Sequence, residues 1–468
     1  MTTGAPSAGT VGRVKLTMLG AGVRAPFVLH GLVDRQHDLG LTEVVLHDRD
    51  PGRLEAMTAL GRSLCETWGG MFELRGDDDP RAALADARFV FAAIRPGQER
   101  ARTFDEELPL RHGVLGQETT GPGGFAMAMR TIPALLEHAH VIEEVAPRAL
   151  LVNFTNPVGI VTQALHDHSS VRVVGVCDGP VSMHRSVAAF LGLPTDHVHL
   201  DYAGLNHCGW IHGVQVGGEE RLPELLDRFE ELQKLDDQWR LFDEELVRSL
   251  GMLPMEYLYF YYSRDRAVEN ILRSGGTRAA QIAAINDALW PELRARVASG
   301  DLAGAAEAWS RAMETRSETY FARERGEDPA PTANGDHEPD PFEGDGYEGV
   351  ATAVMLTVAR HMRVPLILDV VNRGAIGCLD DDDVVEVTCM MDEHGAHPLA
   401  QGRLPEEAES LLRRVKRYER LTVEAATTRS YDTALEALRT NPLVGSPQLA
   451  RSILDDYLSA HAEYLALS

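Results

Sequence analysis

The chain has 468 residues, is 44% hydrophobic and carries a formal net charge of −26. This length suffices for about two or three domains with real cores, while the excess of negative charge argues against nucleic acid or an anionic membrane as partner. Five cysteines, odd in number and thinly spread, are typical of reduced thiols in a cytoplasmic protein. Residues 1–12 lack the apolar core of a signal peptide, and no apolar run reaches the ~20 residues that cross a bilayer.

The first predicted elements indicate a dinucleotide site. An apolar strand-like run, Val14–Leu19, leads into a glycine turn, and a helical stretch over Phe27–Arg35 follows. Gly20 and Gly22, with Val23 after them, would let the backbone approach a pyrophosphate at the open helix N-terminus. The third glycine of the usual fingerprint is missing, so this turn alone is a weak signal.

The next two strand-like runs extend the pattern. Glu43–Asp48 ends in an acid where the ribose hydroxyls of a dinucleotide would lie, although Asp48 could instead cap the helix that starts near Pro51. Arg88–Ile94 ends in Arg95, for which an exposed salt bridge is the alternative to ligand binding. The repeated strand and helix units predict an α/β fold with a Rossmann-like, doubly wound N-terminal domain.

Polar side chains then gather after two more apolar runs, between Leu150 and Pro180. The first run is followed by Asn156, and the second ends in Cys177 and Asp178. Open α/β sheets place ligands at such carboxyl ends. A third run, over 199–210, adds Asn206, His207 and Cys208, so a thiol and an imidazole could converge on one ion.

Each of these residues also has a structural interpretation. Cys177, at the end of a buried strand, could be a small apolar filler. Asn156 could cap the turn ahead of Pro157. Cys208 is expected in the core, because its neighbour His207 already holds the ligand position.

A glycine-rich segment, Gly116–Gly124, precedes a predicted long amphipathic helix over Met127–Ala146. So many glycines beside Gln117 and Glu118 suggest a loop shaped to lie against something, since loops carry function more often than cores do. A solvated connector is the alternative.

Several of these motifs, in this order, resemble those of glycoside hydrolase family 4, the NAD-dependent and divalent-metal-dependent 6-phosphoglycosidases. This family is an exception to the two-carboxylate mechanism of most glycosidases. The resemblance spans nearly the whole chain and rests on the following segments: Gly116–Gly124, Asn153–Pro157, Cys177–Pro180, Gly204–Trp210, Asn372–Ile376, Val384–Val387 and Tyr418–Ala425.

The resemblance implies a reaction without net redox change. NAD takes a hydride from C3 of the sugar, which acidifies the C2 proton. A base removes that proton, the aglycone leaves by elimination from C1, water adds, and the hydride returns. A divalent metal, usually manganese, stabilises the negative charge on the sugar oxygens.

The resemblance also implies a role for each matching residue. Cys177 and His207 match the metal ligands, Tyr257 in the run Met255–Tyr262 matches the base, and Asp178 could protonate the leaving oxygen. Aromatic packing is the alternative for Tyr257. The residues expected to bind the sugar are Asn156, Asn206, Arg95 and Glu118, and those expected to bind NAD are Gly20, Gly22, Val23, Asp48 and Arg95.

Two departures leave the substrate open. Asp178 is typical of 6-phospho-α-glucosidases, whereas Asn153–Thr155 and Gly175–Cys177 look more like the β-type, so the anomer stays undecided. The Pro- and Asp-rich segment Arg325–Gly346 replaces a region where phosphate-using relatives often place a basic residue. Arg373 or Arg264 could substitute, and a non-phosphorylated sugar or a uronide is the alternative.

We expect a NAD-binding domain over 13–180 and an α/β (α+β) domain for substrate, metal and oligomerisation over 181–468. In the second domain, strands at 364–371 and 384–391 are expected in a second layer, and helices at 404–429 and 431–467 are expected to close the sugar site and supply a subunit interface. The resemblance implies a homodimer or homotetramer acting on a small-molecule (phospho)glycoside.

Two rival functions remain. An ordinary NAD-dependent dehydrogenase of a sugar or hydroxy acid would share the fold and release NADH, but would not need Cys177, His207 and Tyr257 together. A regulatory nucleotide-binding protein with a dead site would hold these three side chains far apart.

Overall fold

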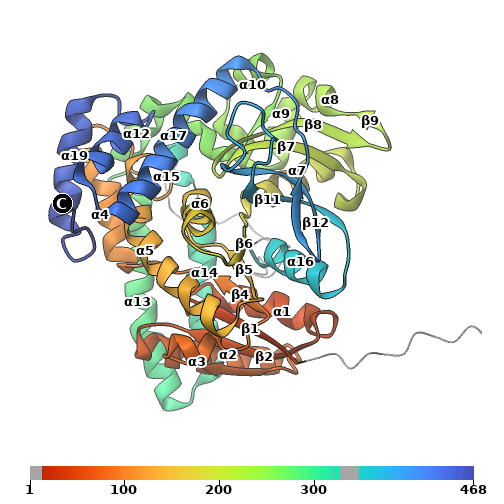
Figure 1. The fold of residues 1–468 in the computed structure, drawn as a ribbon, viewed down its shortest axis with the longest axis vertical. Coiled ribbons are helices and arrows are strands. Elements are labelled where there is room, and N and C mark those ends of the chain that lie inside the picture. Colours follow the sequence, from red (N-terminus) through yellow and green to blue (C-terminus); the bar gives the residue numbers. More distant parts are fainter. Residues whose placement is uncertain (1–12, 320, 327–346, 468) are drawn as a thin grey trace, which may run out of the picture.

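The computed structural model describes residues 13–319, 321–326 and 347–467, and its strands join into one 13-stranded sheet (Figure 1). Half of the sheet is parallel, in the order β3-β2-β1-β4-β5-β6, which is the order of a dinucleotide-binding fold. The predicted Rossmann-like fold is therefore confirmed. Its strands are β1 (Val14–Leu19), β2 (Leu41–His47), β3 (Glu73–Gly76), β4 (Phe89–Ala92), β5 (Leu150–Asn153) and β6 (Arg172–Gly175).

Helices follow these strands, as right-handed crossovers require. Every residue of β1 and of β4 is buried, which is typical of parallel strands covered by helices on both faces. The helices are α1 (Ala25–Leu39), α2 (Pro51–Thr67), α3 (Pro80–Leu84), α4 (Gln98–Arg111), α5 (Pro122–Val145), α6 (Val158–His168) and α7 (Gly179–Leu191).

Helix α5 starts at Pro122, five residues before the predicted Met127, so part of the glycine-rich segment is helical. Its first turn packs too closely for side chains, because a Cβ on Gly124 would lie 2.1 Å from the carbonyl oxygen of Thr119. Proline at the first helical position and glycine at close contacts both suit this start. Glycine content alone had indicated a loop.

The other half of the sheet is antiparallel, and this corrects the expectation of a second layer. Strand β11 pairs with β6 through Asp369 and Gly175, so the later strands extend the same sheet. An apolar strand pattern shows burial but not which edge the strand will join. The strands are β7 (His199–Leu205), β8 (Cys208–Val216), β9 (Glu219–Glu220), β10 (Leu253–Pro254), β11 (Val364–Val371), β12 (Val384–Asp392) and β13 (Gly395–Pro398).

The predicted run over 199–210 is a hairpin, since β7 pairs antiparallel with β8 around the turn at Asn206 and His207. His207 has a φ of 62°, a left-handed conformation that suits a tight turn. The two strands therefore present this turn at the edge where β6 ends.

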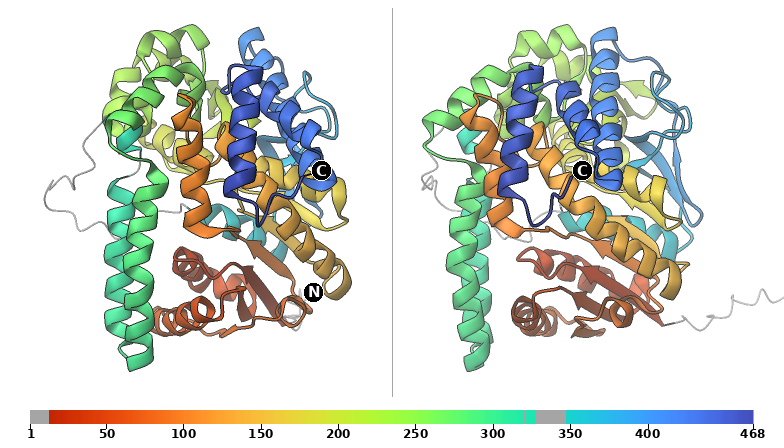
Figure 2. Two further views of the ribbon diagram at one scale, coloured as in Figure 1. Left: turned by 90° about the vertical axis from the view of Figure 1, so that its left-hand side faces the viewer. Right: turned by 60° about the vertical axis from the view of Figure 1, so that its left-hand side comes forward.

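The remaining helices surround the antiparallel half and reach back to the first domain. In Figure 2 the α13–α14 hairpin, in green and teal, stands along one edge of the molecule and passes the N-terminal strands. The helices are α8 (Leu222–Asp227), α9 (Phe229–Leu235), α10 (Glu244–Leu250), α11 (Tyr259–Tyr262), α12 (Arg264–Arg273), α13 (Arg278–Ser299), α14 (Leu302–Glu318), α15 (Ala322–Arg325), α16 (Tyr347–Ala359), α17 (Glu406–Thr428), α18 (Tyr431–Thr440) and α19 (Pro447–Ala460).

The helical stretch expected at 431–467 is two helices, with a tail after α19. None of the helices in the described ranges combines the length and apolarity that a bilayer crossing requires.

Candidate active site

The structure brings together the thiol and imidazole that the strand ends suggested. Cys177 follows β6 and His207 lies in the β7–β8 turn, and both are buried. The Cys177 Sγ and the His207 Nε2 are 3.6 Å apart. Two ligands of one ion, at ~2.3 Å from sulfur and ~2.0 Å from nitrogen, lie about 3.5 Å apart in tetrahedral geometry. This distance therefore fits a shared metal ion.

Hydrogen bonds within the glycine-rich segment fix the tautomer of His207. The Gln117 Oε1 accepts hydrogen bonds from the backbone N–H groups of Thr119 and Thr120. Because an amide oxygen can only accept, the Thr119 hydroxyl donates its proton to the same oxygen. The Thr119 Oγ1, 2.9 Å from His207 Nδ1, must then accept from that nitrogen. The proton of the neutral ring sits on Nδ1, and the Nε2 lone pair faces Cys177, as metal ligation requires.

The electrostatic setting keeps both groups neutral when no ion is bound. Burial lowers the pKa of His207 to about 4. Burial also raises the pKa of the Cys177 thiol, and the nearby Glu386 and Asp178 raise it further. A divalent cation would displace the thiol proton, as metal binding at cysteine generally does.

The pair leaves coordination positions open. Among the described residues, no cluster of three or more His, Cys, Asp or Glu side chains has metal-binding geometry. A catalytic ion needs such open positions for substrate oxygens. The buried Asn156 Oδ1 has no hydrogen-bond partner in the described structure, and Asn153 makes the turn cap instead by accepting from Thr155 N. Asn156 therefore has an acceptor free for a ligand, and the capping interpretation was wrong.

Tyr257 lies directly against this pair. It sits in a 3-10 turn, η3 (Glu256–Leu258), and its ring stacks on the His207 imidazole at a centroid distance of 3.8 Å and an angle of 4°. The rings of Phe321 and Tyr257 make an edge-to-face contact, with their centroids 5.6 Å apart. The tyrosine is thus both a packed aromatic and a neighbour of the proposed metal ligand.

The other predicted residues fall into two groups, one near Cys177 and Glu386 and one around Glu118. Asp178 is half-buried at the start of α7, with its Oδ1 3.9 Å from Cys177 Sγ. Asn206 Nδ2 donates to Glu386 Oε1 at 3.1 Å, and Tyr202 OH donates to the other oxygen of the same carboxyl at 2.8 Å. Glu386 holds the turn that carries His207, a role that its sequence segment did not indicate.

Behind Asn206 lie two buried carboxyl groups. Asp369 and Glu386 come from the neighbouring strands β11 and β12 and are each 1% exposed. Burial raises the pKa of both groups, and the proximity of Glu386 raises the pKa of Asp369 further. The raised pKa values favour protonation of the pair, which limits the negative charge next to the Cys177 thiol.

Glu118 forms an ion-pair network with two arginines. It lies 2.9 Å from Arg95 and 3.0 Å from Arg102. Burial opposes ionisation of Glu118, but Arg102 and Arg95 outweigh it and lower the pKa of the carboxyl to about 2. The carboxylate therefore stays charged and fixes Arg95. Arg102, in α4, was not foreseen.

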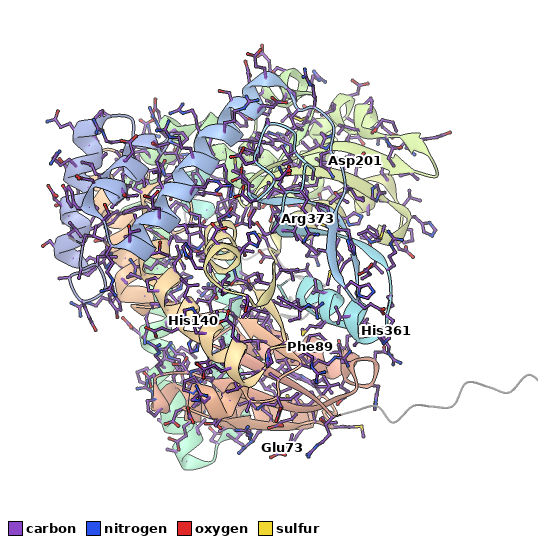
Figure 3. The ribbon with its side chains drawn as sticks, viewed as in Figure 1. Glu73, Phe89, His140, Asp201, His361 and Arg373 are labelled. Carbon is purple, nitrogen blue, oxygen red and sulfur yellow. The ribbon has the colours of Figure 1, made fainter. Side chains whose placement is uncertain are left out.

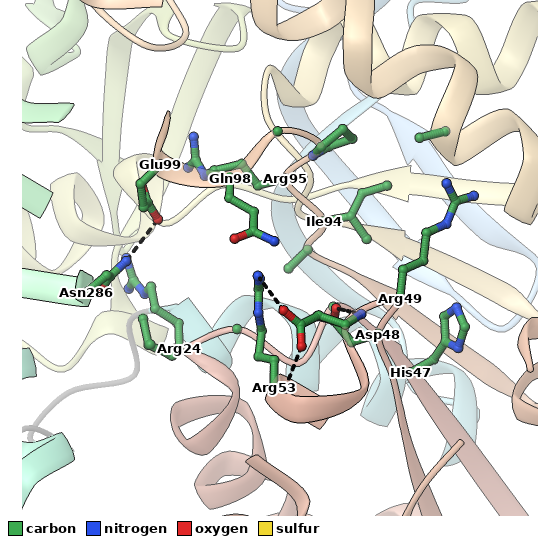
Figure 4. A pocket seen from close by; sticks show the side chains of 18 of the residues that line it. Arg24, His47, Asp48, Arg49, Arg53, Ile94, Arg95, Gln98, Glu99 and Asn286 are labelled. Atoms are coloured by element: carbon green, nitrogen blue, oxygen red, sulfur yellow. Dashed lines mark hydrogen bonds and ion pairs between the residues drawn. The ribbon is translucent and has the colours of Figure 1, made fainter. Parts of the chain in front are cut away.

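A cavity of about 410 Å³ opens at the carboxyl ends of β1, β2 and β4 (Figure 4). All five residues expected to bind the dinucleotide line it: Gly20, Gly22, Val23, Asp48 and Arg95. A Cβ on Gly22 would meet nothing within 4 Å, so this turn leaves room for a ligand against the backbone.

Asp48 supports the glycine turn. Its Oδ2 accepts from Ala21 N at 3.0 Å, whereas the cap of α2 comes from Asp50, which accepts from Arg53 N. The capping alternative for Asp48 is therefore wrong. Two buried atoms on the cavity wall, His47 Nε2 and Asn286 Oδ1, lack a hydrogen-bond partner within the described ranges, as expected for a wall that receives a polar ligand.

Two features of this cavity come from the α13–α14 hairpin and were not predicted from the sequence. Arg316 lines the cavity, and burial together with Arg24 and Arg102 lowers the pKa of its guanidinium to about 9. Trp309 donates its indole N–H to the carbonyl of Val23 at 2.7 Å. A helix more than 280 residues later in the chain than the glycine turn thus holds that turn, and no local pattern reveals such a pair.

The family models match in two consecutive parts: "Family 4 glycosyl hydrolase" over residues 15–193 and "Family 4 glycosyl hydrolase C-terminal domain" over 202–444. The chain belongs to glycosyl hydrolase family 4. This family 4 chain is 32% identical to a probable 6-phospho-β-glucosidase of Bacillus subtilis, over 97% of both chains.

Solved family 4 structures are similar as well. The 6-phospho-β-glucosidase of Thermotoga maritima, with manganese, NAD+ and glucose-6-phosphate, is 26% identical, with a TM-score of 0.81 over 97% of this chain and 100% of that chain. A 6-phospho-α-glucosidase from gut microorganisms, in complex with NAD and Mn2+, is 26% identical, with a TM-score of 0.80 over the same shares. Both anomeric specificities thus occur among its relatives.

The two arginines suggested for a phosphate lie elsewhere in this family 4 chain. Arg264 is exposed and lines a separate cleft with Tyr261 and Tyr262. Arg373 is exposed in the turn after β11 and lies in the upper half of the molecule (Figure 3).

Proposed function

We propose that this protein hydrolyses the O-glycosidic bond of 6-phosphoglucosides with NAD and a divalent metal, manganese in the first instance, as cofactors. The observation that carries the proposal is the Cys177–His207 pair, whose Sγ and Nε2 atoms lie 3.6 Å apart. A cavity lined by the residues expected to bind a dinucleotide accompanies it. The family membership and the cofactors named for the similar structures support it.

Bound NAD would supply a hydride acceptor and donor, and the metal would supply a cation for developing negative charge on sugar oxygens. Cys177 and His207 hold the ion, and Thr119 keeps His207 in the required tautomer. Tyr257, stacked on His207, accepts the proton from the sugar carbon. Asp178, beside Cys177, protonates the leaving oxygen.

Substrate oxygens meet groups with free hydrogen-bonding capacity. Asn156 offers its unpartnered Oδ1 to a sugar hydroxyl, and Asn206, held by Glu386, offers the remaining capacity of its amide. Enclosure of the site excludes water from the reacting carbons, since His207 and Tyr257 are only 7% and 8% exposed.

The 6-phosphate fits the charges around Glu118. Arg95 and Arg102 pair with this carboxylate, and the guanidinium of Arg316 lies in the same field. Burial, and after it the positive charges of Arg24 and Arg102, lower the pKa of Arg316, so an anionic group beside it would stabilise its charged form. A phosphate dianion supplies such charge, whereas a neutral glucoside does not.

The test is hydrolysis of nitrophenyl α- and β-glucosides, each with and without a 6-phosphate, and with NAD and Mn2+ added or removed. We expect cleavage of a phosphorylated substrate only when both cofactors are present, incorporation of solvent deuterium at C2, and no accumulation of NADH. Stoichiometric NADH would instead identify a dehydrogenase. Equal cleavage after complete removal of NAD and metal would refute the proposal.

Further expectations follow from this function. We place the enzyme in the cytoplasm, where its five cysteines, all free, would stay reduced. The homodimer or homotetramer, the domain boundary at 180/181 and the exclusion of nucleic acid and membrane partners stay predictions. Light scattering coupled to gel filtration measures the assembly.

A further inference from the structure

The C-terminal turn lies at the mouth of the proposed cofactor cavity. After α19, Tyr464 N and Leu465 N both donate to the carbonyl of His461 at 2.8 Å, which closes a tight turn. Residues of this turn line a second cavity of about 190 Å³. That cavity shares four residues with the cofactor cavity, namely Arg49, Pro96, Ala134 and Tyr464, so the two adjoin.

A buried ionic network fixes the turn in place. Asp105 accepts from Arg130 Nη1 at 2.8 Å and lies 2.8 Å from His461 Nε2, and its backbone carbonyl accepts from Tyr457 OH at 2.9 Å. Arg130 also donates to the carbonyl of Pro96 at 3.4 Å. The network therefore sets the C-terminal turn against the Pro96 turn, which forms part of the cofactor cavity.

Tyr464 is more exposed than the residues of this network. Its side chain is 42% exposed, while Leu465 beside it is 5% exposed. The Tyr464 ring lies 3.5 Å from the place where a Cβ on Gly97 would stand. A large aromatic ring thus faces solvent at the rim of a cavity, on a rigidly held turn.

The position of the ring indicates which half of a dinucleotide it would meet. Arg49, which lines both cavities with Tyr464, directly follows Asp48 at the end of β2. In this fold the acid at the end of the second strand approaches the adenosine ribose. The ring is therefore on the adenosine side of the cavity. The turn also lies beyond residue 444, where the match to the family's C-terminal model ends.

We propose that Tyr464 contacts the adenosine half of bound NAD, so that the C-terminal turn is part of the cofactor site. This inference rests on the proposed function, since it needs NAD as ligand. Aromatic rings gain affinity by packing on the flat face of a base. Loss of the ring is expected to weaken NAD binding about tenfold.

Isothermal titration calorimetry of the full chain tests this with NAD, ADP-ribose and nicotinamide mononucleotide. Tyr464→Ala should raise the dissociation constants of NAD and ADP-ribose about tenfold and leave that of the mononucleotide unchanged. Tyr464→Phe, which keeps the ring, should bind all three as the wild type does. Met362→Ala is the matched control, because Met362 is also a large exposed side chain, at 40%, and does not line the cavity.

The outcomes separate this inference from the proposed function. If the wild type binds NAD and Tyr464→Ala binds it equally well, the inference is wrong while the function stands. Equal weakening of ADP-ribose and mononucleotide would overturn the adenosine assignment. If the wild type binds no NAD at all, the proposed function fails, and the inference fails with it.

Discussion

Trp309 offers a quantitative test of how the α13–α14 hairpin supports the glycine turn. Its ring is 1% exposed, packs at 5.2 Å from the ring of Phe27, and donates to the Val23 carbonyl at 2.7 Å. Trp309→Phe keeps an aromatic ring but removes this hydrogen bond. Loss of a donor to a buried carbonyl costs about 1–3 kcal/mol, and the smaller ring leaves a cavity that costs about 1 kcal/mol.

We therefore expect the free energy of unfolding, measured by urea denaturation, to fall by about 2–4 kcal/mol. Because Val23 lines the cofactor cavity, we also expect the dissociation constant of NAD to rise about tenfold in calorimetry.

Trp239→Phe is the control for this experiment. Trp239 is fully buried and donates its indole N–H to Ser186 Oγ at 2.8 Å, but it does not line the cofactor cavity. Both variants should lose similar stability, and only Trp309→Phe should lose NAD affinity. If the two variants bind NAD equally well, the hairpin does not position the glycine turn, and the reasoning is wrong.

Three other substitutions test the site. Cys177→Ser should weaken Mn2+ binding by more than about 100-fold in calorimetry, because it removes a direct ligand. Glu118→Gln should lower the free energy of unfolding in urea by about 3 kcal/mol or more, since Arg95 and Arg102 lose their shared carboxylate. Burial lowers the pKa of His138 from 6.5 to about 4 in the folded chain. The unfolded chain binds this proton more readily than the folded chain, so the free energy of unfolding is highest above pH 6.5. It falls by up to about 3 kcal/mol as the pH falls towards 4. In urea titrations, His138→Asn should remove this pH dependence.

For each of these three predictions, one result would contradict it. Cys208→Ser alters a buried thiol next to His207, so equal loss of Mn2+ affinity in both serine variants would show a packing effect and not ligation. A Glu118→Gln protein as stable as the wild type would show that the arginines find other partners. An unchanged pH slope in His138→Asn would place the acid sensitivity on other groups.

Local pattern was sufficient to predict the parallel half of the fold and the position of its polar residues. The apolar run Val14–Leu19 is β1 to the residue, and Cys177 follows a short strand, β6, as expected. Carboxyl ends of parallel strands meet at one edge of a sheet, so the pattern of runs already places the glycine turn, Asp48 and Cys177 along the same edge.

Long-range packing decided the rest, because it depends on which surfaces meet and not on neighbouring residues. The hairpin turn that brings His207 to Cys177, the Glu386 that holds Asn206, and the Trp309 that supports Val23 join segments about 30, 180 and 286 residues apart. An apolar pattern predicts that a strand or helix is buried. It does not predict which other element packs on it, because that depends on the whole fold. The sequence alone therefore determined a dinucleotide-type sheet with a candidate thiol and imidazole, while the tertiary structure alone decided their 3.6 Å separation, the His207 tautomer and the C-terminal turn at the cavity mouth.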